Sequence, residues 1–208
     1  MTEPKPSARI GGKATDKPQL TRDNWLDAAA GEVAAGGFGN LRVLTLSKKL
    51  GVTRGSFYWH FKDHEDLVTS FLNRWRDRRL HELLYWKPDV NSTGDVEAEL
   101  KSILELLLTD ASRNIRRLQV ELAVRDFARR NDYAADLVAE VDAARIDQNC
   151  LLLQRISSDP RRVRDLSTLL YVATIGSQVV LTGQKGDEDA ISRIEDLLAR
   201  VVLGQGDM

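Results

Sequence analysis

Residues 42–67 constrain the fold of this 208-residue chain most, because they place two short helical runs on either side of a glycine turn. The first run carries one apolar stripe at helical spacing, formed by Val43, Leu46 and Leu50. Gly51 follows directly and suits a left-handed helix C-cap, where residues with a side chain are strained. Thr53 then offers a hydroxyl N-cap for a second helix, which we expect over 54–60. Two short helices joined by so tight a turn predict a helix-turn-helix.

The second run is rich in hydrogen-bond donors and aromatic rings, as a helix that reads a DNA groove would be. Arg54 and Ser56 lie in its first turn, the part of a recognition helix that meets base edges in the major groove. Between Gly37 and Lys62 the chain has five basic residues and no acidic one, although the whole chain has 30 basic and 31 acidic residues. Such a local positive charge can neutralise phosphates, so this segment predicts a DNA-binding head.

The same segment resembles the DNA-binding signature of TetR-family transcriptional regulators, over about the first third of the chain. The resemblance is carried by Gly37, Phe38, Leu50, Gly51, Val52, Thr53, Ser56, Phe57, Tyr58, His60, Phe61, Glu65, Asp66 and Leu67. It implies that Thr53, Arg54, Ser56, Tyr58 and His60 lie on the helix that faces DNA.

Three residues depart from the usual pattern of that family. Arg42 stands where Ser or Thr usually caps the second helix, and Ser47 stands where Ala is usual. His64 replaces a Lys that opens the fourth helix and touches phosphate. The resemblance implies that Lys62 or His64 takes over this last contact.

Together these arguments predict nine DNA-binding residues. Phosphate contacts are expected from Lys48, Tyr58 and Lys62. Contacts with bases are expected from Arg42, Arg54, Ser56 and Trp59. The complete set is Arg42, Lys48, Thr53, Arg54, Ser56, Tyr58, Trp59, His60 and Lys62.

Two alternatives apply to this segment. Its aromatic residues can be core side chains, an interpretation that we adopt for Phe57 and Phe61 and leave open for Trp59. His60 and His64 stand four residues apart with acidic neighbours, as in some metal sites. The Phe-Lys-Asp break between these histidines would spoil that geometry, so no metal site is expected.

The rest of the chain indicates an all-α protein of about nine helices in three parts. Residues 1–19 are rich in proline, glycine and basic residues and are expected to be a disordered tail, either solvated or lying along DNA; we favour the solvated tail. Residues 20–63 form the three-helix head, with ten bases and six acids in residues 1–63. Residues 64–208 form a helical body for ligand binding and dimerisation, with 20 bases and 25 acids. In this body, the arginines at 74–79 are interpreted as a solvated face with acidic partners on neighbouring helices.

Composition narrows the class of protein. The chain has no apolar run of the ~20 residues that a membrane helix needs, and its start lacks the apolar region of a secretory signal. A single cysteine, Cys150, excludes an internal disulfide and suits a reducing cytoplasm. The sequence has no phosphate-binding glycine loop, nucleophile elbow or cysteine cluster, so neither an enzyme nor a cofactor is expected.

The last two helices carry apolar stripes that predict a four-helix bundle with a second copy. The expected dimerisation residues are Leu170, Ala173, Ser177, Ile191, Ile194, Leu198 and Val201. The alternative is that these stripes face the chain's own core. The family resemblance favours the dimer.

We therefore expect a homodimeric repressor that an unknown small molecule releases from a palindromic operator in double-stranded DNA. The alternatives are a helical ligand-binding or adaptor protein, and an activator of the same fold.

No residue is assigned to the ligand. Five aromatic or polar side chains of the body that could line a cavity are interpreted instead as surface or packing residues: Trp75, Trp86, Gln119, Asp126 and Gln148.

Overall fold

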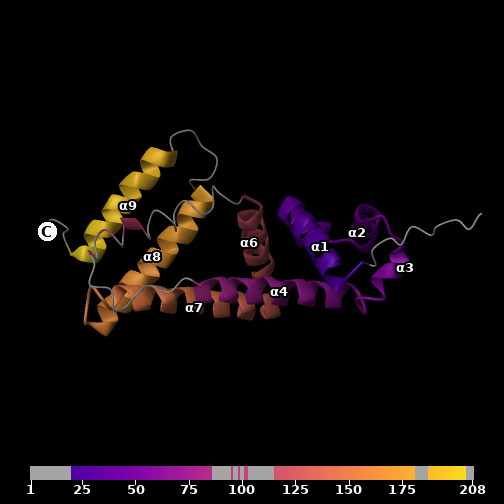
Figure 1. Ribbon diagram of the computed structural model, residues 1–208, viewed down its shortest axis with the longest axis horizontal. Helices are drawn as coiled ribbons and strands as arrows, with labels where there is room; N and C mark the ends of the chain where they lie inside the picture. Colours follow the sequence, from indigo (N-terminus) through magenta and orange to yellow (C-terminus); the bar gives the residue numbers. More distant parts are fainter. Residues whose placement is uncertain are drawn as a thin grey trace, which may run out of the picture.

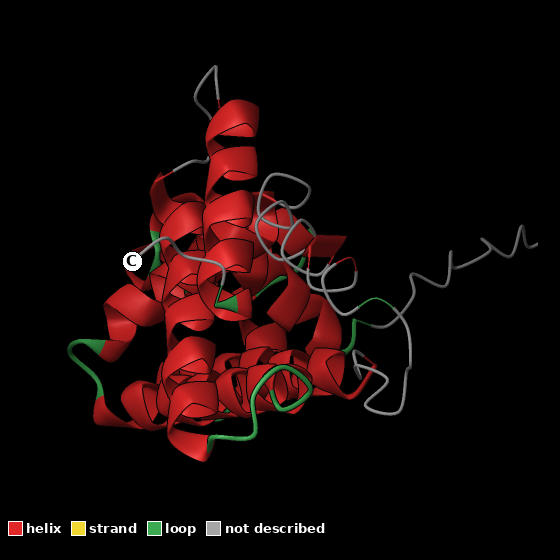
Figure 2. Cartoon of the chain, turned by 90° about the vertical axis from the view of Figure 1, so that its left-hand side faces the viewer, coloured by secondary structure: helices red, strands yellow, loops and turns green. Residues whose placement is uncertain are grey.

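The computed structural model describes residues 20–85, 95, 98, 101–102, 115–180 and 187–204. Its helices are α1 (Arg22–Gly36), the 3₁₀ helix η1 (Phe38–Asn40), α2 (Val43–Leu50), α3 (Arg54–Phe57), α4 (His64–Tyr85), α6 (Ile115–Ala128), α7 (Asp132–Leu153), α8 (Pro160–Val180) and α9 (Asp187–Leu203). No strand occurs among these residues (Figure 2). The all-α fold is therefore confirmed, with eight α-helices in the described part against about nine expected for the whole chain.

The helices form an elongated molecule (Figure 1). The head, made of α1, η1, α2 and α3, lies at one end, and α8 and α9 lie at the other. Helices α4 and α7 run side by side along the molecule and connect the two ends. Helix α6 packs against both α1 and α7, so the head touches the body through α6 as well as through α4.

Side chains cap the starts of α1, α7 and α8. Thr21 and Asn24 form a capping box at α1, in which the Thr21 N–H donates to Asn24 Oδ1 at 2.8 Å. Asn131 caps α7 by accepting a backbone N–H at 2.9 Å. Asp159 accepts the Arg161 N–H at 3.0 Å, directly before the proline that opens α8. These local interactions explain why the starts of the helices are predictable from sequence.

A first apolar cluster joins the head to the body. Phe38 of η1 stacks on Phe127 of α6 with ring centroids 4.2 Å apart and meets Phe71 of α4 edge-on at 5.6 Å. Buried residues of α1, α2, α4, α6 and α7 belong to the same cluster. The core is thus continuous across the boundary expected after residue 63, and the head is held firmly against α4 and α6.

A second apolar cluster lies at the far end, between the end of α7, α8 and α9. Its buried members are Leu152, Leu153, Val163, Leu166, Leu170, Leu198, Ala199 and Val202. Cys150 is half-buried against it, as a small packing residue would be.

A buried network of charges connects α6, α7 and α8. Glu121 is only 4% exposed and accepts hydrogen bonds from Arg125 at 3.0 Å and from Arg145 at 2.9 Å. Arg125 also forms a bidentate pair with Asp142, at 3.0 and 2.6 Å. Tyr171 of α8 donates its hydroxyl to the same Asp142 carboxylate at 2.5 Å. Three helices are therefore joined by one network of charged and hydroxyl groups in the interior of the body.

The expected dimerisation residues are partly turned inward. Leu170, Ser177 and Leu198 are buried, Leu170 and Leu198 against α7, α8 and α9 of the same chain, so these side chains are not available to a second copy. Ala173 and Ile194 are half-buried against the same cluster, whereas Val201 is exposed. The side chain of Ile191 lies outside the described residues. The sequence misleads here because α8 and α9 are apolar on more than one face.

Other expectations need smaller corrections. Helix α3 ends at Phe57 instead of His60. The tail at 1–19 and Trp86 lie outside the described residues. Within the described part of the chain, no helix is long and apolar enough to cross a membrane.

Candidate nucleic-acid interface

The turn between α2 and α3 has the expected geometry. Gly51 adopts a left-handed conformation with φ of 67°, which a residue with a side chain would adopt only under strain. Its N–H donates to the Lys48 carbonyl at 3.2 Å, and the Val52 N–H donates to the Ser47 carbonyl at 3.0 Å. These two bonds close α2, and α3 begins three residues after the glycine.

Aromatic packing holds α3 in place. Phe57 is fully buried and meets Trp25 of α1 edge-on, with ring centroids 5.5 Å apart. Phe61 is also buried and stacks on Phe57 at 5.2 Å. The expectation that both phenylalanines are core residues is confirmed. Because α3 has only four residues, this packing, more than its own hydrogen bonds, fixes its orientation.

The other side of α3 faces solvent. Trp59, which the sequence left open between core and surface, is 88% exposed and is therefore a surface residue. Tyr58 is 54% exposed, and its hydroxyl accepts a long hydrogen bond of 3.4 Å from Arg54. Thr53 has the extended backbone of an N-cap, but its side chain makes no capping hydrogen bond, contrary to expectation. Helix α3 and the turn after it thus present a polar and aromatic surface to solvent.

All nine expected DNA-binding residues have some exposed surface. The seven exposed residues are Arg42, Lys48, Thr53, Arg54, Tyr58, Trp59 and Lys62. Ser56 and His60 are half-buried, and the His60 ring lies 6.3 Å from that of Trp25. Among the described residues, none of Arg42, Lys48, Arg54 and Lys62 forms a salt bridge. These four cations are therefore available to phosphates.

Other basic side chains of the head have structural roles instead. Lys49 pairs with Glu32 of α1 at 2.8 Å. Arg22 donates to the His60 carbonyl at 3.0 Å and to Asp66 at 2.9 Å, which ties α1 to the segment after α3. His64 Nε2 lies 2.6 Å from the Leu41 carbonyl, so a hydrogen bond inside the fold occupies the side chain that replaces the usual Lys.

The other two departures from the family pattern have local explanations. Arg42 occupies the N-cap position of α2 with extended backbone but makes no side-chain cap. Ser47 is buried, and its hydroxyl donates to the Val43 carbonyl at 2.8 Å. This bond within α2 satisfies a hydroxyl that would otherwise be costly to bury.

The start of α4 fixes the segment that follows α3. The Asp66 N–H donates to Asp63 Oδ1 at 2.8 Å, and Asp66 Oδ2 accepts the Lys62 N–H at 2.9 Å. The hydrogen bond from the Lys62 backbone is the largest influence on the pKa of Asp66, which is lowered. This charged form also pairs with Arg22, so α1, the α3–α4 turn and α4 meet at one carboxylate.

The helix-turn-helix segment matches the model of "Bacterial regulatory proteins, tetR family" over residues 26–71. This segment is therefore similar to the DNA-binding part of TetR-family regulators. The chain is 29% identical over 90 residues to the HTH-type transcriptional regulator AcrR of Shigella flexneri, a match that covers 43% of this chain and 35% of that protein. It is 27% identical over 109 residues to the regulator SrpR of Pseudomonas putida, covering 52% of this chain and 49% of that one. The match thus spans half or less of the length of these relatives.

Solved structures extend the likeness in fold to most of the chain. A putative transcriptional regulator from Saccharomonospora viridis in complex with choline has a TM-score of 0.67 and 19% identity, covering 87% of this chain and 94% of that chain. The regulator FadR of Bacillus subtilis in complex with stearoyl-CoA has a TM-score of 0.62 and 17% identity, covering 90% of this chain and 100% of that chain. At this level of identity the likeness shows the fold.

Sequence reasoning missed the environment of the arginines in the helical body. Arg74 and Arg76 have the acidic partners on neighbouring helices that a solvated face would have, Asp27 of α1 and Glu140 of α7. Arg79 is instead buried. Of the side chains weighed for a ligand cavity, Trp75 does line one, together with arginines of α4 and α6. No signal in the sequence brings these helices together, because the contacts join residues some 40 to 90 positions apart.

Within the described residues, no group of three or more histidine, cysteine or carboxylate side chains is placed to hold a metal ion. His60 and His64, weighed as metal ligands, have other contacts: the ring of Trp25 and the Leu41 carbonyl.

Proposed function

We propose that this protein is a homodimeric transcriptional repressor that binds a palindromic operator in double-stranded DNA and leaves it when a small molecule binds to the body. The observation that carries the proposal is the exposed surface of α3 and the turn after it, with Arg54, Tyr58 and Trp59 directed outward while Phe57 anchors the helix. The match of residues 26–71 to the family model of TetR regulators supports the same activity. Binding to chromosomal DNA would place the protein in the cytoplasm.

Different roles are proposed for the exposed side chains. Lys48, Tyr58 and Lys62 would position the head on phosphates, since phosphate contacts fix register but carry no sequence information. Arg54 and Ser56 open the recognition helix and would meet base edges, with Arg42 and Trp59 beside them. Thr53 and His60 complete the proposed surface.

The proposed dimer uses side chains that the chain leaves exposed on α8 and α9. The exposed apolar residues of these helices are Leu169, Val172, Val179, Val180, Leu197 and Val201. On α8, Leu169, Val172 and Val179 recur at intervals of three and seven residues, which places them along one side of the helix, with Val180 next to them. Pairing this face with that of a second copy would make a four-helix bundle. The two heads would then enter successive major grooves, about 34–36 Å apart.

A small-molecule effector is proposed from the family and from two solved structures of similar fold, which contain choline and stearoyl-CoA. Such a molecule releases DNA only if it binds more tightly to the form of the protein whose heads do not fit the operator.

Replacement of Arg54 tests the DNA-reading surface. On the site that the protein selects from random duplex DNA, Arg54→Ala should cost about 1–3 kcal/mol and relax the preference at one base position. Arg130→Ala is the matched control, because Arg130 is an exposed arginine in the turn after α6 that pairs with the nearby Asp126, and the variant has the same net charge. Fluorescence anisotropy with single-base variants of the site gives both affinities and preferences. An unchanged base preference for Arg54→Ala would remove this residue from the readout.

A pair of glutamate substitutions tests the dimer face. Val172 is 60% exposed, so Val172→Glu should leave the monomer folded but split the dimer and weaken operator binding sharply. Leu170, two residues earlier, is fully buried, so Leu170→Glu should instead unfold the end of the body. Light scattering and circular dichroism distinguish the two results. A Val172→Glu protein that remains a dimer with full operator affinity contradicts the proposed interface.

A further inference from the structure

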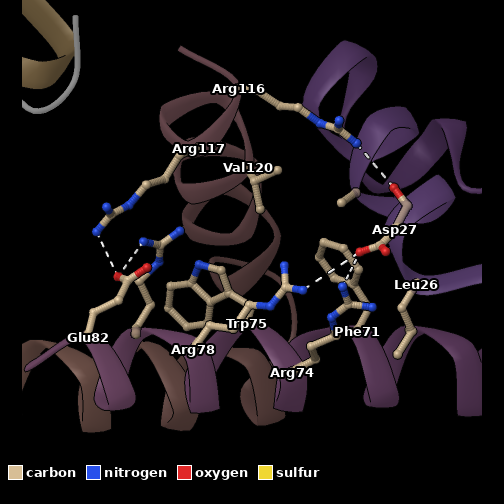
Figure 3. Close-up of a pocket in the computed structure, with 12 residues that line it drawn as sticks. Leu26, Asp27, Phe71, Arg74, Trp75, Arg78, Glu82, Arg116, Arg117 and Val120 are labelled. Atoms are coloured by element: carbon tan, nitrogen blue, oxygen red, sulfur yellow. Dashed lines mark hydrogen bonds and ion pairs between the residues drawn. The ribbon is translucent and has the colours of Figure 1, made fainter. Parts of the chain in front are cut away.

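A cavity of about 530 Å³ lies between α1, α4 and α6, where the head meets the body (Figure 3). We call it the junction cavity. Its volume lies in the range of small-molecule sites in proteins. It is lined by Leu26, Asp27, Ala30, Phe71, Arg74, Trp75, Arg78, Arg79, Glu82, Arg116, Arg117 and Val120.

Arginines outnumber acidic residues in this lining. The lining has five arginines and two carboxylates. Two carboxylates outside the lining, Asp23 and Glu121, lie 3.4 Å from Arg74 and 3.5 Å from Arg79, so the arginines still exceed their acidic partners. One group surrounds Asp27 of α1: Arg74 forms a close ion pair with its carboxylate, Arg78 lies 3.7 Å from it, and Arg116 donates to its backbone carbonyl at 3.1 Å. All three extend toward Asp27 in Figure 3.

The second group surrounds Glu82 of α4. Arg79 and Arg117 approach this carboxylate at 2.8 and 2.7 Å. Burial lowers the pKa of Arg79, and the charge of Arg117 lowers it further, against the opposing effects of Glu82 and Glu121. The carboxylates near Arg79 therefore do not fully offset the cost of its charge.

The wall between the two groups is apolar and aromatic. Trp75 lies between them in Figure 3, with Phe71, Leu26 and Val120 also in the lining. Trp75 is 4% exposed, and its indole N–H has no hydrogen-bond partner among the described residues. A buried donor without an acceptor is uncommon in folded proteins and is satisfied if a ligand supplies one.

We propose that the junction cavity binds an amphipathic organic anion, whose carboxylate or phosphate is held by the arginines and whose apolar or aromatic part lies against Trp75 and Phe71. Arginine forks bind both kinds of oxyanion with paired hydrogen bonds. The Trp75 N–H adds a neutral donor next to the arginines.

The position of the cavity couples this anion to the head. Asp27 belongs to α1, whereas the arginines around it belong to α4 and α6. An incoming anion competes with Asp27 for Arg74, Arg78 and Arg116, and so loosens ion pairs that hold the head to the body. The head packs closely here, because a Cβ atom on Gly31 of α1 would lie only 3.2 Å from the Arg116 guanidinium. This regulatory step rests on the proposed operator binding, whereas binding of the anion does not.

Nuclear magnetic resonance of the tryptophan side chains tests the binding step on the full chain. The protein has four tryptophans, and the Trp75→Phe variant identifies the indole signal of Trp75. The probes are 1-naphthyl phosphate and 1-naphthoate, with the neutral 1-naphthalenemethanol and inorganic phosphate as controls. We expect saturable shifts of the Trp75 signal with one or both organic anions, and weaker binding of both controls. Which anion binds more tightly distinguishes a phosphate site from a carboxylate site.

Two arginine variants locate the site. Replacing two of the arginines, as Arg78→Gln with Arg116→Gln, should weaken anion binding by about tenfold or more, since each hydrogen bond between charged groups contributes substantially. Arg76→Gln is the matched control in the same helix, because Arg76 pairs with Asp77 and with Glu140 of α7, outside the cavity. No shift with either anion, equal binding of the neutral alcohol, or equal losses in Arg76→Gln would overturn the proposal.

A DNA titration separates this proposal from the proposed function. If the protein binds its selected DNA site but no anion shifts Trp75, the junction site is wrong and the repressor proposal stands. If the anion binds but no DNA site is selected, the site stands and the repressor proposal fails. When both bind, saturating anion should weaken operator binding, and an unchanged affinity would contradict the coupling.

Discussion

Arginines line both the junction cavity and the interior between α6, α7 and α8, but their partners differ. In the interior, Arg125 and Arg145 face the two carboxylates of Glu121 and Asp142, and Tyr171 adds a hydroxyl to the same network. Arg79 of α4 also approaches Glu121, at 3.5 Å, but the hydrogen bonds of the interior pair two arginines with two carboxylates. The lining of the junction cavity has five arginines and two carboxylates, although Asp23 and Glu121 outside the lining also pair with Arg74 and Arg79. The buried Trp75 N–H there has no partner among the described residues.

The difference separates a structural use of arginine from one suited to binding. A balanced, buried network costs a great deal to break but offers nothing to a ligand. An unbalanced cluster beside a cavity is less stable by itself and gains from an added anion. The interior network holds α6, α7 and α8 in a fixed arrangement. The junction cavity lies where the head contacts the body and could move relative to it.

The largest expected effect comes from breaking the interior network. Glu121→Gln leaves Arg125 and Arg145 with less compensating charge in a buried site, so the free energy of unfolding should fall by about 3–5 kcal/mol. The control, Asp126→Asn, breaks an exposed pair with Arg130 at the end of α6 and should change the free energy of unfolding by no more than about 0.5 kcal/mol. Urea unfolding measures both. Similar losses in the two variants would show that the interior network is no more important than a surface pair.

Acid should weaken the interior network for the same reason. Burial alone would raise the pKa of Glu121, but the charges and hydrogen bonds of Arg145 and Arg125 outweigh it and lower this pKa to about 2. Because the folded pKa lies below the ordinary value of 4.5, the ionised group stabilises the fold above about pH 4.5. This contribution, about 3 kcal/mol, is lost as the pH falls toward 2. The stability difference between wild type and Glu121→Gln should therefore shrink over that range, and a constant difference contradicts the assignment.

The smallest effect on stability is expected in the junction cavity. Asp27 is 60% exposed in its side chain, so Asp27→Asn should lower the free energy of unfolding by less than about 1 kcal/mol. It removes a competitor for Arg74 and Arg78, so binding of 1-naphthyl phosphate should tighten several-fold. Asp77→Asn, which removes the partner of Arg76, is the control for anion binding. Calorimetric titration distinguishes the variants, and weaker binding by Asp27→Asn would argue against competition.

The sequence predicts those parts of the structure that local interactions determine. The bounds of α2 follow from its apolar stripe and from Gly51, and the starts of α1 and α8 follow from Thr21 and from Asp159. The exposed residues of α3 and the turn after it were also predictable in part. Phe57 and Phe61 fill the buried side of this short segment, so its other side chains face solvent.

Contacts between distant helices could not be predicted from the sequence. Helical periodicity identifies an apolar face but not its partner, so Leu170 was assigned to a dimer although it packs inside the chain, while Val172 is exposed. The junction cavity depends on Asp27, Arg74 and Arg116, which three different helices bring together. Their spacing in the sequence carries no sign of this proximity.

Selection of binding sites from a random duplex DNA library, with the full chain, tests whether this protein recognises DNA through α3. We expect enrichment of a palindrome whose half-sites are one helical turn apart or a multiple of it, and loss of enrichment when Arg54→Ala is used instead. A folded dimer that enriches no sequence at low salt would contradict DNA recognition by α3. It would favour a helical ligand-binding protein that retains the head without using it.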